Sequence, residues 1–184
     1  MKNLNKVVKI LAKVLEIVHW VGAGLMVAVA ICSKAAPQWL GSFIDINSLE
    51  NGAEASAYGF EVGVTNSVGE VNLTTLMLFA IGSVIIFALV AMIFRNIHLI
   101  IKKSESETPF NKDNTRMVRE IGIFSIGIPV VGLIMSTIIR LVIGVDATEI
   151  SVSSYGFVMG IIVLCLTQFF AYGAELEKDV DGLL

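Results

Sequence analysis

Two ionisable residues, Glu16 and His19, interrupt the first apolar stretch of the sequence. Their spacing of three places both side chains on one side of a helix. An ionisable group inside a bilayer is costly, so the pair suggests a functional polar site within the membrane. The alternative is structural, because Glu16 lies about one turn from Lys13. A pair that snorkels to the cytoplasmic interface, or a hydrogen bond to a neighbouring helix, would also satisfy this carboxylate.

The few residues that could bind a cofactor are widely separated. A haem with two axial histidines would need both His19 and His98, and His98 lies beyond Arg95, outside the expected membrane core. The two cysteines, Cys32 and Cys165, lie far apart in or beside apolar stretches. That pattern is typical of small buried residues and gives no support for a disulfide framework or a zinc site. The sequence therefore predicts no cofactor and no metal ion.

Arg140 is a third candidate polar residue within the apolar stretches. It follows Glu120 by about 20 residues, or about 30 Å of helix. This distance places Arg140 at the outer membrane interface, where it can act as an anchor. It can also pair with Asp146 or Glu149 in the loop that follows.

The sequence contains no motif of a known enzyme class. It has no Walker loop, His-Glu-x-x-His pair, nucleophile elbow or paired intramembrane carboxylates. We therefore expect no catalytic residues and a protein that is not an enzyme. Transporters commonly show inverted repeats and interrupted spans, whereas here Pro129 alone interrupts an apolar stretch.

Charged residues gather in two polar segments that could form a docking surface. The connector 95–119, RNIHLIIKKSESETPFNKDNTRMVR, contains six basic and three acidic residues, and the tail 175–184 is mainly acidic. If both lie on one side of a membrane, opposite charges can pair with each other or bind a cytoplasmic partner. The residues in this hypothesis are Lys112, Arg116, Arg119, Glu175, Glu177 and Asp179. The alternative is that the connector only orients the chain and the tail is solvated.

The elements that must position these residues are four apolar spans. The chain has 184 residues, of which 55% are hydrophobic and 16% charged, and its mean hydropathy is +0.82. Such a chain is too apolar for its own polar surface to cover it in water. Stretches long enough to cross a bilayer cover residues 14–32, 73–94, 121–142 and 152–172. We therefore expect a single all-α membrane domain, a four-helix bundle.

The basic residues predict the orientation of these spans. Four lie in the first thirteen residues and six in the connector 95–119, whereas the loop 33–72 has one and the loop 144–151 has none. The positive-inside rule then places both termini and the connector in the cytoplasm. We expect a multi-pass protein of the cell membrane. The first span is interpreted as a retained signal anchor, although Ala35 and Ala36 leave cleavage open.

The long outer loop 33–72 is acidic and rich in turn residues. Ser42–Ile46 and Tyr58–Thr65 alternate apolar and polar residues, and Asn51-Gly52 is a strong turn signal. We therefore expect the loop to hold a small β-hairpin. It is long for a simple connection, so it serves either as a partner surface or as a cap on the bundle.

Local signals also predict a helix start and a packing face. Asn111 has the side chain of an N-cap, and Asp113 in the following turn complements the helix dipole. In the last span, Gly156 and Gly160 form a small-xxx-small pattern that lets helix backbones approach closely. The pattern indicates packing within the bundle and leaves the oligomeric state open.

Short motifs in the connector and the tail resemble a known family. In the connector these are Thr108, Pro109, Phe110 and Asn111, then Asn114, Arg119, Ile121 and Gly122. In the tail they are Phe170, Ala171, Tyr172, Gly173, Ala174, Glu175 and Leu176, then Asp179 and Asp181. The chain resembles the bacterial four-span membrane family catalogued as domain of unknown function 2975, except for its acidic outer loop. The resemblance implies a cytoplasmic-membrane protein, chiefly of Gram-positive bacteria, whose genes often neighbour a helix-turn-helix regulator, with no established activity.

Three classes of function remain. The first is a non-enzymatic regulatory or sensory membrane partner, with the connector and the tail presented to a cytoplasmic regulatory protein. The second is an immunity protein whose outer loop meets a peptide toxin. The third is a small transporter or a transporter accessory subunit. The partners expected are the lipid bilayer and, for the first class, a cytoplasmic regulatory protein; direct nucleic acid binding is not expected.

Overall fold

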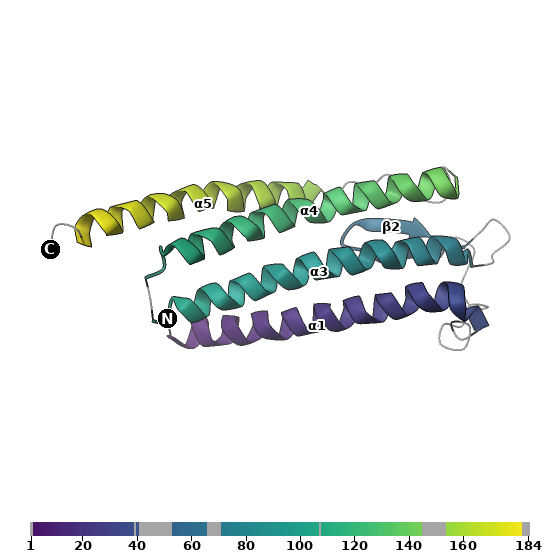
Figure 1. Ribbon diagram of the computed structural model, residues 1–184, viewed down its shortest axis with the longest axis horizontal. Coiled ribbons are helices and arrows are strands. Elements are labelled where there is room, and N and C mark those ends of the chain that lie inside the picture. The colour runs from purple at the N-terminus through teal and green to yellow at the C-terminus, as the bar shows by residue number, and fades with distance from the viewer. Residues whose placement is uncertain are drawn as a thin grey trace. The chain divides into compact units, whose positions relative to one another are not determined.

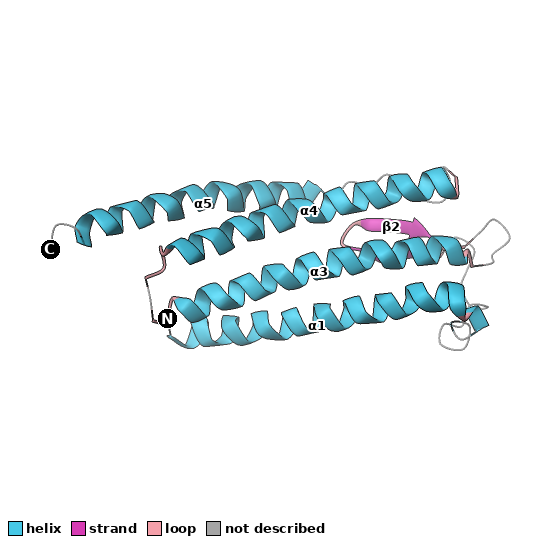
Figure 2. Cartoon of the chain, viewed as in Figure 1, coloured by secondary structure: helices cyan, strands magenta, loops and turns pink. Residues whose placement is uncertain are grey.

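A computed structural model of the chain describes residues 2–38, 40, 53–65, 71–106, 108–144 and 154–181. Four long helices dominate these residues (Figures 1 and 2). They are α1 (Lys2–Ala35), α3 (Leu73–Lys103), α4 (Lys112–Val142) and α5 (Ser154–Asp181). Each contains a stretch long and apolar enough to cross a membrane. The predicted, mostly helical fold with four such helices is confirmed, and it fits a multi-pass membrane protein.

The helices extend well beyond the apolar stretches that predict them. The structure continues α3 to Lys103, past the end of the predicted membrane span at residue 94, and begins α4 at Lys112, directly after the predicted N-cap Asn111 and ahead of the predicted span at 121. The added turns carry most of the charged residues of the connector. The chain forms two compact units. The first comprises Met1–His19, Leu89–Gly127 and Ser154–Leu184, and the second comprises Trp20–Ala88 and Ile128–Ser153.

The second unit contains the predicted β-hairpin. Strand β1 (Glu54–Ala57) pairs antiparallel with β2 (Phe60–Gly63). Tyr58 and Gly59 form the two-residue turn with positive φ angles of 53° and 82°, the combination of a type I′ turn. The hairpin is confirmed, but the prediction of one strand over Tyr58–Thr65 is wrong, because its first two residues make the turn. The other predicted strand, at 42–46, and the turn at 51–52 lie outside the described residues.

One face of the hairpin forms the core of the second unit. Phe60 is 2% exposed and its ring stacks on Phe79 of α3 at a centroid distance of 5.3 Å. Gly82 of α3 makes room for this ring, since a Cβ there would lie 2.8 Å from it. Buried residues from β1, β2, α3 and α4 complete the cluster: Ala57, Val62, Ile86, Met135 and Ile139.

The contact at Gly82 also fixes how deeply the hairpin lies along α3. Gly82 follows Leu73, the first residue of α3, by nine positions, which is about 13 Å of helix. The hairpin therefore packs along the sides of α3 and α4 within the second unit (Figure 1). Its opposite face is exposed and polar, with Glu54, Ser56 and Glu61. Of the two roles predicted for the loop, the packing of this segment supports a structural one.

In the first unit neighbouring helices run antiparallel. The Lys9 ammonium of α1 donates to Glu105, just after α3, at 2.6 Å. Asn96 of α3 donates to Glu120 of α4 at 3.0 Å. Gly122 of α4 and Gly160 of α5 meet at close range, since a Cβ on Gly160 would lie 2.8 Å from the carbonyl oxygen of Gly122. These contacts fix the register of each helix against the next.

Candidate functional site

A groove of about 910 Å³ lies in the first unit between the first turns of α4 and the last turns of α5. Five of the six residues predicted for a docking surface line it: Lys112, Arg116, Arg119, Glu175 and Glu177. The sixth, Asp179, is exposed on α5 and is not part of the lining. The structure thus brings residues from the connector and the tail to one concave surface, with Ala171 and Ala174 contributing to its apolar part.

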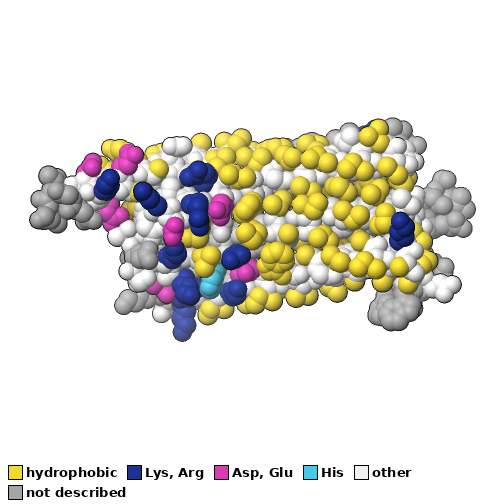
Figure 3. All heavy atoms as spheres, in the orientation of Figure 1, with side chains coloured by type: hydrophobic (Ala, Val, Ile, Leu, Met, Phe, Trp, Pro, Cys, Tyr) yellow, Lys and Arg dark blue, Asp and Glu magenta, His cyan; other side chains and the backbone are white. Residues whose placement is uncertain are grey.

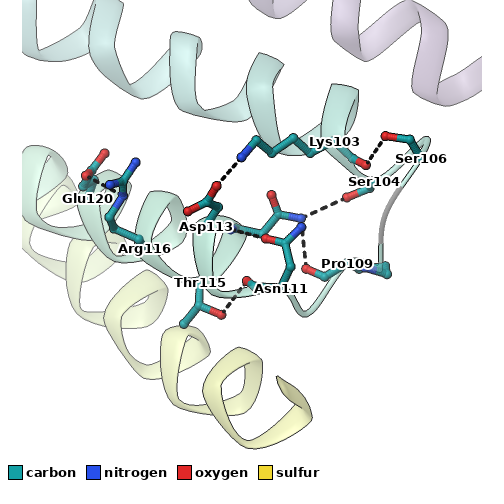
Figure 4. A network of polar contacts seen from close by, with 10 residues as sticks. Lys103, Ser104, Ser106, Pro109, Asn111, Asp113, Thr115, Arg116 and Glu120 are labelled. Carbon is teal, nitrogen blue, oxygen red and sulfur yellow. Dashed lines mark hydrogen bonds and ion pairs between the residues drawn. The ribbon is translucent and has the colours of Figure 1, made fainter. Parts of the chain in front are cut away.

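The start of α4, which carries the basic residues of the groove, is fixed by two asparagines (Figure 4). Asn111 is the N-cap, as predicted, since its side-chain oxygen accepts from the backbone N–H of Asn114 at 2.7 Å. The Asn114 amide is fully buried and donates to the carbonyl oxygen of Pro109 at 3.1 Å and to Ser104 at 3.4 Å. Asn114 therefore ties the end of α3 to the start of α4. No spacing or local signal in the sequence indicates this role, although Asn114 lies within the motif of the family resemblance.

An ion pair joins the same two helix ends. Lys103 donates to Asp113 (Figure 4). The hydrogen bond and the charge of Lys103 lower the pKa of the Asp113 carboxyl, and Arg116 contributes further. Both side chains are substantially exposed, so the pair adds little to stability and mainly keeps Asp113 ionised.

Phe110, which lies just before the start of α4, also lines the groove. Its ring lies 5.5 Å from that of Phe170, and a Cβ at Gly173 would lie 2.7 Å from it. The neighbouring Thr108 hydroxyl donates to Glu177 at 2.8 Å. The contact with the Phe110 ring explains why position 173 is a glycine. The sequence alone does not indicate that these two residues meet.

The register of α5 against α4 separates the predicted charge partners. From the contact between Gly122 and Gly160, Arg119 lies three residues along α4 and Glu175 lies fifteen residues along α5 in the same direction. At 1.5 Å per residue, Glu175 is therefore about 18 Å beyond Arg119 along the helix axes. Among the described residues, none of the three basic residues of the docking hypothesis forms an ion pair with Glu175, Glu177 or Asp179.

The basic residues of the groove are poorly compensated. Arg116 lies 3.6 Å from Glu120, at the long end of an ion pair, and its side chain is 66% exposed. Glu120 also accepts the hydrogen bond from Asn96. Over the part of the chain that the structure describes, Lys112 and Arg119 have no ion-pair partner.

The predicted intramembrane polar residues are satisfied locally. Glu16 is 7% exposed and accepts from Lys13 at 2.9 Å, which agrees with the structural interpretation of this residue. His19 makes its hydrogen bond to the Leu15 carbonyl of its own helix at 2.7 Å, and its ring lies 5.4 Å from that of Phe94. No group of three or more His, Cys, Asp or Glu residues that could hold a metal ion occurs among the described residues.

The remaining predicted residues lie away from the groove. Arg140 is half-buried in the last turn of α4, and its two predicted acidic partners are outside the described residues. Gly160 makes the predicted close contact, and its partner is Gly122 of α4, which the sequence analysis did not pair with it. Gly156 is only half-buried.

Comparison with known proteins does not identify a family for this chain. No family model matches the chain, and no curated protein or solved structure matches it significantly. The resemblance to the four-span family therefore stays a prediction.

Proposed function

We propose that the four helices cross the cell membrane with both termini and the connector in the cytoplasm. Ten of the 13 Lys and Arg residues lie in the amino-terminal flank and the connector, which supports this orientation. Figure 3 shows Lys and Arg side chains gathered around the ends of α3 and α4 that the connector joins, while the helices beyond are covered with hydrophobic side chains.

In this orientation the protein acts as a non-enzymatic regulatory or sensory membrane partner, and the groove between α4 and α5 binds a cytoplasmic regulatory protein. The observation that carries the proposal is the groove itself. A concavity of about 910 Å³ with charged side chains of both signs around an apolar part has the character of a recognition site. The acidic end, with Glu175 and Glu177, lies furthest from the apolar stretch of α4 and is the part that a cytoplasmic protein would reach first.

Site-specific photo-crosslinking in native membranes tests the proposal. A photoreactive residue at Glu175, which lines the groove, should capture a discrete cytoplasmic protein. The matched position is Leu176, the next residue of α5, which is 49% exposed but does not line the groove. Capture of the same cytoplasmic proteins at both positions, or of none at Glu175, would refute docking in the groove.

A second candidate, an immunity protein, is favoured by the hairpin. Its exposed face presents Glu54, Ser56 and Glu61 while the other face is held in the core. Such a polar surface, held along α3 and α4, suits recognition of a basic peptide toxin that enters the bundle from the outer side. Replacing Glu54 with lysine should abolish protection in a toxin challenge if this candidate is correct, and should leave survival unchanged if it is not.

A further inference from the structure

We propose that Lys112, Arg116 and Arg119 of α4 bind the phosphate of an anionic phospholipid headgroup at the membrane-proximal end of the groove. This inference rests on the proposed placement in the membrane but not on the docking of a protein. It assigns the two ends of the groove to different chemistry. The basic end binds lipid, and the acidic end remains for a cytoplasmic partner.

The three basic residues form a single stripe. Their spacings of four and three residues superpose them on one face of α4, and all three are exposed and line the groove. A phosphate group has several acceptor oxygens, and guanidinium groups can bind it through paired hydrogen bonds. The stripe is therefore suited to holding one headgroup by more than one side chain.

Among the residues that the structure describes, the acids leave most of this stripe without a partner. Asp113 is paired with Lys103, on the end of α3. Because of the register of α5, Glu175 lies about 18 Å beyond Arg119 and about 13.5 Å beyond Arg116 along the axes, and about 7.5 Å beyond Lys112. Only Glu120 approaches, at 3.6 Å from Arg116, and that carboxylate is shared with an asparagine. The membrane-proximal end of the groove therefore keeps a net positive charge that an anion from outside the chain can complement.

The depth of the stripe matches the headgroup layer. The hydrogen bond between Asn96 and Glu120 aligns Arg119 with the end of the apolar stretch of α3, which closes at Arg95. The headgroup layer extends about 5–7 Å beyond the hydrocarbon core on each side. Arg116 lies about 4.5 Å further along α4 than Arg119, so both guanidinium groups fall within this layer. Lys112 lies about 10.5 Å beyond Arg119, so it contributes charge from just outside the layer, while Arg116 and Arg119 make the direct contacts.

The same face of α4 continues with apolar surface towards the membrane. Ile123 follows Arg119 by four residues and is 51% exposed. A lipid whose phosphate contacts Arg116 and Arg119 would therefore lay the start of an acyl chain along Ile123. This combination of a basic stripe and an exposed apolar residue on one helix face favours a membrane lipid over a free phosphate ion.

Native mass spectrometry of the purified full-length protein can test the site directly. The protein is reconstituted in nanodiscs of mixed phosphatidylglycerol and phosphatidylcholine, and the lipids retained on release are counted. Wild type should retain phosphatidylglycerol in preference to phosphatidylcholine. The triple variant Lys112→Gln, Arg116→Gln and Arg119→Gln should lose at least about tenfold of this preference, since each basic residue near an anionic surface contributes measurably. Because no cytoplasmic protein is present, failure of the docking proposal would not affect the result.

Two further variants make the outcome specific. The control Lys6→Gln, Arg95→Gln and Lys102→Gln removes the same charge from exposed residues outside the groove and should keep the preference. The variant Arg116→Lys and Arg119→Lys keeps the charge and should retain most of the preference for phosphatidylglycerol. This result separates lipid binding from a folding defect. Equal loss of the preference for phosphatidylglycerol in the control triple variant would overturn the assignment. It would also be overturned if millimolar inorganic phosphate displaced the bound phosphatidylglycerol as effectively as added phosphatidylglycerol does.

Discussion

Replacing Gly160 with alanine tests the close crossing of α4 and α5 that sets the shape of the groove. A Cβ at this position would lie 2.8 Å from the carbonyl oxygen of Gly122 and 3.1 Å from the backbone nitrogen of Ile126, and it would also collide with the Ile126 side chain. Two of these three neighbours are helix backbone atoms, which cannot turn aside as the end of a flexible side chain can. One added methyl group must therefore push the two helices apart.

The size of the effect follows from two opposing contributions. Adding a methyl group to a closely packed contact typically costs about 1–3 kcal/mol. Replacing glycine by alanine within a helix stabilises it by about 1 kcal/mol, which hides part of that cost. Gly24→Ala is the matched control, because Gly24 is also helical and a Cβ there would meet nothing within 4 Å. The difference between the two variants isolates the overpacking contribution.

Thermal unfolding in detergent, followed by circular dichroism, measures this difference. For a chain of this size about 1 kcal/mol corresponds to roughly 2–4 °C in Tm, so Gly160→Ala should melt roughly 2–12 °C below Gly24→Ala. Gly160→Leu should be less stable again, while Val163→Leu on the same helix should have a smaller effect. If Gly160→Ala and Gly24→Ala melted at the same temperature, the close crossing and the register derived from it would be wrong.

Three other perturbations address the orientation, the hairpin and the connector. In a cysteine-free background, an impermeant thiol reagent should label Ser56→Cys in intact cells but Ser106→Cys only after permeabilisation; labelling of Ser106→Cys in intact cells contradicts the orientation. Phe60→Ala should destabilise the second unit by about 3–5 kcal/mol, because it empties a buried position. Phe169→Ala, at a side chain that is 70% exposed, should cost much less on the same denaturation curves. The pKa of Asp113 is lowered from 3.8, so its stabilising contribution is complete above that pH and is lost only as the pH falls through the lower folded-state pKa. The difference in Tm between wild type and Asp113→Asn should therefore stay constant from pH 7 to pH 4 and shrink only at lower pH.

Hydrophobicity and local signals were enough to predict the helices and one of their starts. An apolar stretch of about 20 residues has few alternatives to a membrane-length helix. The N-cap at Asn111 could be predicted because the capping hydrogen bond joins residues only three apart in the chain. The charged turns 95–103 and 112–120 continue α3 and α4 beyond the apolar spans, as the predicted N-cap at Asn111 indicates for α4.

The hairpin could be predicted in kind but not in detail. Alternation of apolar and polar residues identified a strand around Val62, but Asn51-Gly52 offered a stronger turn signal than Tyr58-Gly59. Tyrosine rarely adopts a positive φ, so the turn is not evident from residue preferences. What favours it is the burial of Ala57 and Phe60 on one face, which depends on α3 and α4 and is not encoded locally.

The register of α5 lay beyond what periodicity can indicate, and the composition of the groove depends on it. In a lipid solvent, large apolar residues can face lipid or protein at similar cost, so the apolar pattern of a span does not fix how far it slides along its neighbour. Small residues do carry that information, because only a pair of glycines lets the backbones of α4 and α5 approach at Gly122 and Gly160. From this one contact Glu175 and Glu177 of α5 are carried past Arg116 and Arg119 of α4, so these predicted partners occupy opposite ends of one groove with Lys112 between them. Both proposals for the groove depend on this separation, the lipid phosphate at Arg116 and Arg119 and the cytoplasmic protein at Glu175 and Glu177.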